Sequence, residues 1–354
     1  MPKASYRTKS RTLKICDVDV EPGEVSNMAL PLPEIFSYSP MYMPIKIVHG
    51  RYQGPVLLIV ATFTGNAING IEIINRFLHL SLLKNLSGTI IAAPIFDVYG
   101  FITRFHRMEY TSNFSFDQAF LGSKEGSFTE RYIDLFKREI LSKIDYSISL
   151  SSNSQNYHDL PKIFADPYFE ENISLAKSFA APVISLSKAE LGSFHSEMKA
   201  IGKPSLGYEA GELARFNEYA IRPGLRGIVN VLRSLGMLSR TKKESKSPVK
   251  PLFIEKISWI RTPKWGISRT KIPLGREVQE GERIATISDP FGLTEPTTVH
   301  APYNGIIIGK TSFPICYEGG ILFQIARFKN TAQAAEQIED WRESQADNDE
   351  KSDA

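Results

Sequence analysis

The chain has 354 residues, of which 42% are hydrophobic and 23% are charged, and its net charge at neutral pH is +3. This composition is typical of a globular protein with room for one large domain and one small one. The small net charge argues against nucleic acid as a partner, and no stretch approaches the ~20 apolar residues that a membrane span needs.

The segment 1–13 is predicted to be a flexible N-terminus. It is basic and free of acidic residues, and no apolar run follows it, so neither a signal peptide nor a membrane anchor is expected. The cysteines, Cys16 and Cys316, lie near opposite ends of the chain and are too few for a disulfide framework or a thiolate metal site. We therefore expect a cytoplasmic location.

The first half of the chain is predicted to contain a β-α-β unit. Short strands are expected between residues 14 and 50. Residues 56–62 form a continuous apolar run, which is typical of a strand buried on both faces. Residues 68–82 have helical spacing and 89–95 form a second buried strand, so the unit is complete within about 40 residues.

Helices and strands continue to alternate to about residue 238. Helices are expected over 122–140 and 224–236, the second ending at a glycine. Strands are expected over segments that are short and apolar: 146–150, 181–186 and 205–209. The order predicts an α/β fold with a mixed, mainly parallel sheet and helices on both faces.

The composition changes after residue 238. Residues 239–251 are polar, basic and flanked by proline, which predicts a linker. Residues 252–328 have short alternating patterns and frequent turns, which predict a small all-β domain. The remaining 329–354 form an acidic tail that begins as a helix and is expected to be disordered from Glu343 onward.

Motifs in chain order carry a resemblance to a known family. They are Gly65-x-x-Ile-Asn-Gly-Ile-Glu, Val98-Tyr-Gly-Phe-Ile, Asp159-Leu-Pro-x-Ile-x-Ala, Tyr208-Glu-Ala-Gly-Glu and Ser288-Asp-Pro-Phe-Gly. Together they resemble the succinylglutamate desuccinylase/aspartoacylase family, which is related in fold to zinc carboxypeptidases. The resemblance covers roughly residues 15 to 328. It implies a deacylase-like α/β domain over 14–238 and the family's β appendage over 252–328.

In this family a zinc ion held by two histidines and a glutamate polarises an amide carbonyl and activates water. The resemblance places these three ligands at Thr64, Ala67 and Ser151. Alanine has no donor atom and neutral hydroxyls are poor zinc ligands, so we expect no metal and no other cofactor. The chain is thus identified as a degenerate member of the family, a pseudoenzyme that lacks the zinc site.

Three other residues correspond to parts of the family's substrate site. Glu209 matches the catalytic glutamate, a general base, and Arg104 and Asn113 match side chains that hold the substrate. Zinc lowers the pKa of water from 15.7 to about 7, which is on the order of 12 kcal/mol, whereas a general base contributes roughly 3–5 kcal/mol. We therefore interpret Glu209 as a remnant that hydrogen-bonds to nearby backbone or to Arg215.

Two alternative chemistries are left open by the residues. His106 and Glu109 have the spacing of a displaced metal pair, although they lie in an expected loop. Hydroxyl, imidazole and carboxyl groups also lie within ten residues of one another and could form a serine hydrolase site, but no Gly-x-Ser-x-Gly motif accompanies them. These residues are Ser151, Ser152, His158 and Asp159. His195 is expected on the surface or in the pocket wall.

Three functions remain as hypotheses. The first is a non-catalytic binding or regulatory protein for a small acidic or amino-acid-like ligand, forming a homo-oligomer or pairing with an active relative, with no nucleic acid or membrane partner. The second is a zinc-dependent hydrolase of an N-acyl amino acid or related amide that uses unrecognised ligands. The third is a structural subunit built on the β appendage and the acidic tail.

Overall fold

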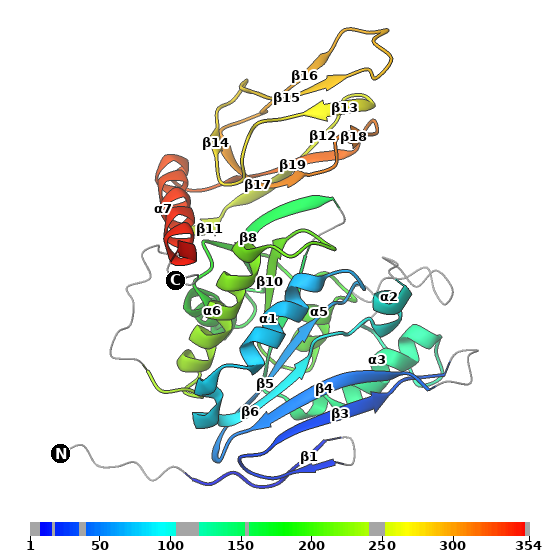
Figure 1. Cartoon of the computed structure of the whole chain (residues 1–354), viewed down its shortest axis with the longest axis vertical. Helices are drawn as coiled ribbons and strands as arrows, with labels where there is room; N and C mark the ends of the chain where they lie inside the picture. Colours follow the sequence, from blue (N-terminus) through cyan, green and yellow to red (C-terminus); the bar gives the residue numbers. More distant parts are fainter. Residues whose placement is uncertain are drawn as a thin grey trace, which may run out of the picture.

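A computed structural model describes residues 8–15, 18–34, 40–103, 120–152, 156–240 and 252–350. Figure 1 shows a large α/β body and, at the far end of the long axis, a smaller β region with one long helix beside it. The amide of Ser10 donates to the carbonyl of Arg51, and the amide of Gln53 donates to the carbonyl of Thr8. The N-terminal segment from Thr8 therefore lies along the start of strand β5.

The centre of the main sheet is parallel. Its strands are β6 (Ser87–Ala93), β5 (Tyr52–Ala61), β7 (Tyr146–Ser151) and β10 (Ser205–Gly211), in that order. Strand β6 is buried along its whole length and β5 is buried from Leu57 to Ala61. The continuous apolar runs are explained by this position, because helices cover both faces of the sheet here.

Antiparallel strands flank this centre. On one side lie β4 (Tyr42–His49) and β3 (Val25–Pro31), and on the other lies β8 (Tyr157–Ala165). Beyond them, β9 (Val183–Leu186) runs parallel to β8, and β11 (Leu252–Ile254) runs parallel to β9. A separate hairpin forms from β1 (Leu13–Ile15) and β2 (Val18–Val20).

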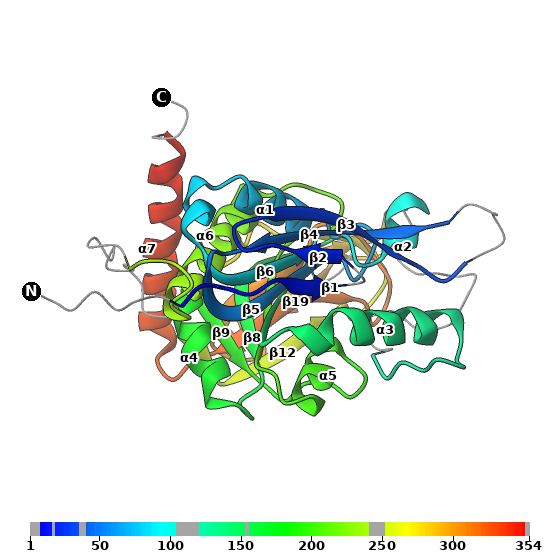
Figure 2. The same cartoon turned by 90° about the horizontal axis from the view of Figure 1, so that it is seen from below.

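Helices cover both faces of the sheet, which confirms the expected fold class. On one face pack α1 (Ile68–Leu78), α4 (Glu170–Phe179) and α6 (Glu218–Ser234), and on the other α3 (Phe128–Glu139) and α5 (Phe194–Ala200). Figure 2 shows α1 and α6 on the side of the sheet opposite α3 and α5. The short helix α2 (Val98–Thr103) follows β6, and short 3₁₀ segments lie at Ser81–Asn85 and Leu141–Lys143.

Two predicted helix starts are wrong. Helix α3 begins at Phe128 rather than near residue 122, because Ser127 accepts a hydrogen bond from the Glu130 amide at 3.3 Å while the Glu130 carboxylate accepts from the Ser127 amide at 2.7 Å. This reciprocal capping box fixes the first turn. Helix α6 begins at Glu218, before residue 224, with Asn217 as its N-cap.

The C-terminal region is all-β up to residue 327, as expected. Strands β12 (Lys256–Arg261), β19 (Ile321–Arg327), β17 (Gly305–Thr311) and β14 (Glu277–Val278) extend the main sheet. They do so because β17 pairs antiparallel with β8, with Lys310 opposite His158. A second sheet contains β16 (Thr297–His300), β15 (Arg283–Ser288), β13 (Gly266–Arg269) and β18 (Ile315–Cys316). Most of the expected linker, from residue 241, lies outside the described residues.

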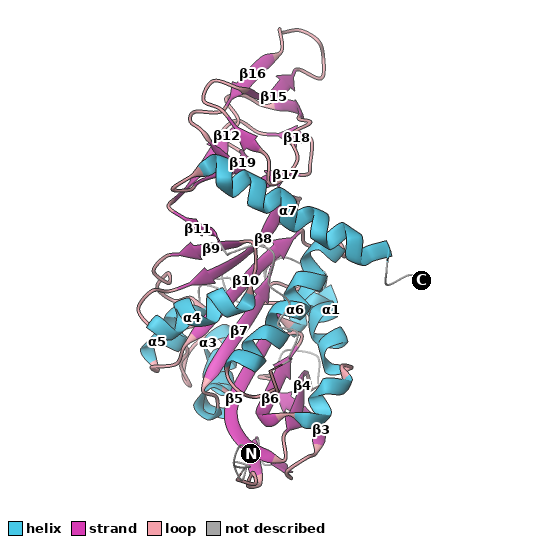
Figure 3. Cartoon of the chain, turned by 90° about the vertical axis from the view of Figure 1, so that its left-hand side faces the viewer, coloured by secondary structure: helices cyan, strands magenta, loops and turns pink. Residues whose placement is uncertain are grey.

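The last helix, α7 (Thr331–Glu350), crosses the junction of the two regions (Figure 3). Its buried Ala334, Ile338 and Trp341 pack with Leu160 of β8 and Ile306 of β17. This helix continues to Glu350, where disorder was expected from Glu343 onward. None of the helices in the described ranges combines the length and the apolar character that crossing a membrane requires.

Candidate functional site

A pocket of about 210 Å³ opens where strands β5, β7 and β10 end. The carboxyl ends of parallel strands meet at one edge of such a sheet, where loops and helix starts can surround a ligand. The four positions that the resemblance assigned to zinc ligands and catalytic base lie together in this pocket. They are Thr64, Ala67, Ser151 and Glu209. Side chains of Phe63, Ser149, Ser193, Phe194 and His195 complete its lining.

The turn between β5 and α1 is held tightly. Thr62 has a left-handed φ of 61°, and its hydroxyl donates to the carbonyl of Pro94 at 2.9 Å. A Cβ at Gly65 would lie 2.0 Å from the carbonyl carbon of Gly100, so no side chain fits there. Ala67 occupies the N-cap position of α1 without a side-chain cap. The backbone frame of the turn is therefore intact although its two ligand positions carry no metal-binding side chain.

Asn69 fastens this turn to the segment after β10. Its Nδ2 donates to the carbonyl of Glu212 at 3.0 Å, and its Oδ1 accepts from the amide of Asn217 at 2.9 Å. The amide of Ala214 also donates to the carbonyl of Asn66 at 2.8 Å. Because Asn69 is only 2% exposed, this bridge is protected from water and fixes the two sides of the pocket.

Glu209 is paired with a buried lysine. Nζ of Lys162, on β8, lies 3.1 Å from Oε2 of Glu209 and 2.9 Å from Oδ1 of Asp159. Burial lowers the pKa of Lys162, but the two carboxylates raise it by more, so its pKa is above the ordinary value and it stays charged. The expected partner, backbone or Arg215, is thus corrected to Lys162.

A hydrogen-bonded relay formed by Ser149, His195 and Ser205 lies beside the pair of Glu209 and Lys162. Nε2 of His195 is 3.0 Å from the hydroxyl of Ser149, and its Nδ1 is 3.0 Å from the hydroxyl of Ser205. A Cβ at position 207 would come within 2.8 Å of Nε2, so Gly207 makes room for the ring. Burial lowers the pKa of His195 to about 4, so the imidazole is neutral and weakly basic at neutral pH.

The cluster considered as a serine hydrolase does not assemble. The hydroxyls of Ser151 and Ser152 donate to the backbone carbonyls of Tyr208, at 3.5 Å, and of Ala210, at 2.9 Å. Nε2 of His158 bonds to Asn217, and Asp159 bonds to Lys162. Since neither serine hydrogen-bonds to His158, no nucleophile and base pair exists within this group.

The described lining of this pocket does not fit a zinc ion. Its lining offers two common zinc-binding side chains, His195 and Glu209, and its other side chains are hydroxyl-bearing or apolar. Both imidazole nitrogens already make hydrogen bonds, and the carboxylate already has Lys162 as partner. Over the described part of the chain, no group of three or more His, Cys, Asp and Glu side chains is placed to hold a metal.

Some predicted positions are not placed. Arg104 and Asn113, and the displaced metal pair His106 and Glu109, lie outside the described residues. Conversely, sequence reasoning missed Lys162, Ser149 and Ser205. Lys162 leaves one trace in the sequence, since it interrupts the apolar run 160–165, but the serines leave none.

Comparisons with known proteins agree with this fold. A model of the succinylglutamate desuccinylase/aspartoacylase catalytic domain matches residues 53–235. The N-alpha-acetyl-L-2,4-diaminobutyric acid deacetylase of Halomonas elongata is 23% identical over 286 residues, covering 77% of this chain and 82% of that protein.

Solved structures share the fold. A succinylglutamate desuccinylase/aspartoacylase from Rhodobacter sphaeroides matches with a TM-score of 0.78 and 20% identity, covering 90% of this chain and all of that one. The product-bound ectoine utilization protein EutE (DoeB) from Ruegeria pomeroyi matches with a TM-score of 0.75 and 18% identity, covering 85% of this chain and 95% of that one.

Proposed function

The chain belongs to the succinylglutamate desuccinylase/aspartoacylase family, and from this premise we propose that it is a binding protein that has lost the family's zinc-dependent hydrolase activity. The observation that carries the proposal is the pocket itself. Thr64, Ala67 and Ser151 line it together, in a frame that is otherwise retained, and none of the three supplies a zinc ligand.

The remaining groups are poor substitutes for a metal. A lone general base supplies roughly 3–5 kcal/mol, far less than the activation of water by zinc. Glu209 shares its carboxylate with Lys162, and the low pKa of His195 makes its imidazole a weak base. Amide hydrolysis also needs stabilisation of the developing oxyanion, for which the lining offers hydroxyls and no described cation.

The charge of the pocket favours an amino-acid-like ligand. Asp159, Lys162 and Glu209 together carry one excess negative charge, and the Glu209 side chain is 34% exposed. A ligand ammonium group can therefore pair with Glu209 while the hydroxyls of Thr64 and Ser193 accept or donate hydrogen bonds. A volume of about 210 Å³ limits the ligand to a small molecule. An acidic group on the ligand would depend on Arg104 and Asn113.

The test combines metal analysis with binding. Purified full-length protein, dialysed against zinc and then against metal-free buffer, is expected to retain far less than one zinc per chain. It is expected to bind 2,4-diaminobutyrate or its Nα-acetyl derivative in calorimetry, to release no acetate, and to bind more weakly after Glu209→Gln. Retention of one zinc per chain, with chelator-sensitive release of acetate, would establish the hydrolase instead.

Self-association and pairing with an active relative are part of the same proposal. Light scattering of the purified chain, alone and mixed with a zinc-binding family member, measures both. A monomer that forms no complex leaves ligand binding as the whole function.

A further inference from the structure

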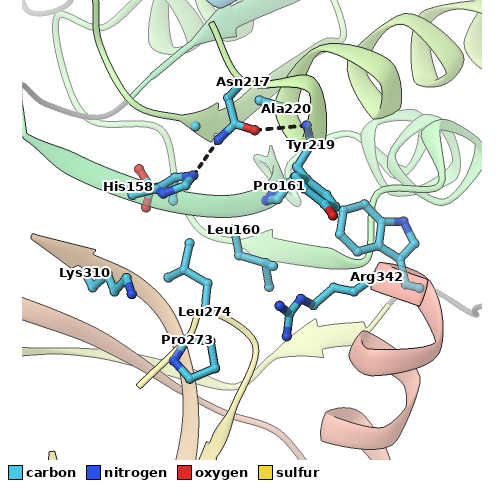
Figure 4. A pocket seen from close by; sticks show the side chains of 13 residues that line it. His158, Leu160, Pro161, Asn217, Tyr219, Ala220, Pro273, Leu274, Lys310 and Arg342 are labelled. Carbon is cyan, nitrogen blue, oxygen red and sulfur yellow. Dashed lines mark hydrogen bonds between the residues drawn. The ribbon is translucent and has the colours of Figure 1, made fainter. Parts of the chain in front are cut away.

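A second pocket lies away from Glu209, at the junction of the α/β body and the β region. Its volume is about 260 Å³, and strand β8, helix α6, the loop before β14, strand β17 and helix α7 all contribute to it. Figure 4 shows these side chains converging on one space. The relay around His195 does not reach it, because the two pockets share no lining residue.

The walls of this junction pocket are largely apolar and partly aromatic. Leu160 and Pro161 come from β8, Leu274 from the loop before β14, and Trp341 from α7. Tyr219 also lines the pocket and is 47% exposed, whereas Trp341 is 6% exposed. An aromatic ring suits this lining, because rings gain from edge and offset contacts with Trp and Tyr beyond the area they bury.

Two cations face this apolar space. In Figure 4, Lys310 and Arg342 approach the pocket from opposite sides, with Leu274 between them. Nζ of Lys310 donates to the carbonyl of Ile272 at 3.0 Å, and an ammonium group has three donors. Arg342 bonds to Glu339 of its own helix at 3.0 Å. Lys310 therefore keeps donor capacity for a ligand.

A neutral histidine also lines the pocket. The Asn217 Oδ1 accepts from the amide of Tyr219 at 2.9 Å, so its Nδ2 is the atom that donates to Nε2 of His158 at 2.6 Å. Nε2 then accepts, and the ring proton lies on Nδ1. Burial lowers the pKa of His158, which keeps the ring neutral. The acid in the lining, Asp159, is bonded to Lys162.

We propose that the junction pocket binds a small aromatic monocarboxylate, with its ring against Leu160, Leu274 and Trp341 and its carboxylate on the ammonium of Lys310. The volume is below the roughly 300–1,000 Å³ of pockets for drug-sized ligands, which suits a single ring on a short acid chain. Burial, and then the charge of Arg342, lower the pKa of Lys310. An anion bound between Lys310 and Arg342 would raise the pKa of Lys310 and so offset the effects of burial and of the Arg342 charge.

Calorimetry of the full chain with 3-phenylpropionate and 3-phenylpropionamide tests the proposal. The carboxylate is expected to bind at least tenfold more tightly than the neutral amide. Lys310→Gln is expected to weaken the carboxylate at least tenfold and the amide less than twofold. Lys271→Gln, which removes an exposed cation outside this pocket, is the matched control and is expected to change neither.

Tryptophan fluorescence places the ligand. Binding of 3-phenylpropionate is expected to change the emission of the wild-type chain, and Trp341→Phe is expected to abolish that change while calorimetry still detects binding. Equal affinity for the acid and the amide, or no binding of either, overturns the proposal on the wild-type chain alone. An emission change that survives Trp341→Phe overturns the location.

Discussion

The ammonium of Lys162 lies 3.1 Å from the carboxylate of Glu209, the residue that the resemblance matches to the family's catalytic glutamate. The same ammonium lies 2.9 Å from Asp159, so one buried cation serves two carboxylates on neighbouring strands. This pairing gives Glu209 a structural role that needs neither zinc nor substrate. Under the proposed loss of the zinc site, it also gives a reason for a glutamate to be retained at this position.

Lys162→Met is expected to destabilise the protein by about 3–5 kcal/mol, because it removes the buried cation that pairs with both carboxylates. Urea unfolding at pH 7 measures the loss. Lys188→Met, at an exposed position, is the control and is expected to stay within about 0.5 kcal/mol of wild type. Equal effects of both substitutions at pH 7 would contradict the pairing.

His195 is expected to make stability fall in acid. Its folded pKa of about 4 lies below the ordinary 6.5, so the unfolded chain binds the proton first as the pH drops. The stability is fully present above pH 6.5, decreases as the pH falls toward 4 and is lost below it. At 1.36 kcal/mol per unit, the contribution is about 3 kcal/mol.

The measurement is the pH dependence of urea unfolding between pH 7.5 and 4.0, for wild type and for His195→Asn. Other groups titrate in both proteins, so the difference between the two curves isolates His195. The variant is expected to lose the descending part between pH 6.5 and 4. Parallel curves over this range would show that the ring is already accessible to protons.

The sequence predicts the centre of the fold because the physical signal there is local. Strands β5 and β6 are continuous apolar runs, and α1 between them has a clear apolar face. The resemblance of separate motifs singles out Thr64, Ala67, Ser151 and Glu209, and the structure brings these four positions together in one pocket.

Non-local features are not predictable in this way. Strand β8 was missed because Pro161 and Lys162 interrupt its apolar pattern, and its pairing with β17 joins residues about 150 positions apart. The length of α7 was missed because its outer face is acidic, while Ala334 and Ile338 gain their burial from β17 and β8. The relay of His195 depends on serines from two different strands.

Gly65→Ala tests the close approach beneath the turn. The new Cβ would lie 2.0 Å from the carbonyl carbon of Gly100, so backbone must move, and we expect a loss of at least about 1–3 kcal/mol. Gly202→Ala is the control. Gly202 has a positive φ of 72° but nothing within 4 Å, so its cost is conformational and about 1 kcal/mol. Thermal unfolding ranks the two, and a Gly65 variant as stable as the Gly202 variant would mean that the turn is not tightly held.

The triple substitution T64H/A67E/S151H is expected to create a zinc site. The three positions line one pocket, and Ser151 is paired in register with Glu209, so the restored side chains start from strands and a turn whose backbone is already in place. Two imidazoles and a carboxylate are a zinc-binding set that leaves one coordination position open. Metal analysis after dialysis is expected to give about one zinc per chain for the triple variant and far less for each single substitution.

T64H/A67E/S152H is the matched control for the rebuilt site. Ser152 follows Ser151 directly, and its hydroxyl donates to the carbonyl of Ala210, so an imidazole there starts on the other side of the strand. This control is expected to bind no more zinc than the wild type. If the T64H/A67E/S151H variant folds and also binds none, the three positions do not correspond to the family's ligands, and the proposed loss of hydrolase activity is left without its basis.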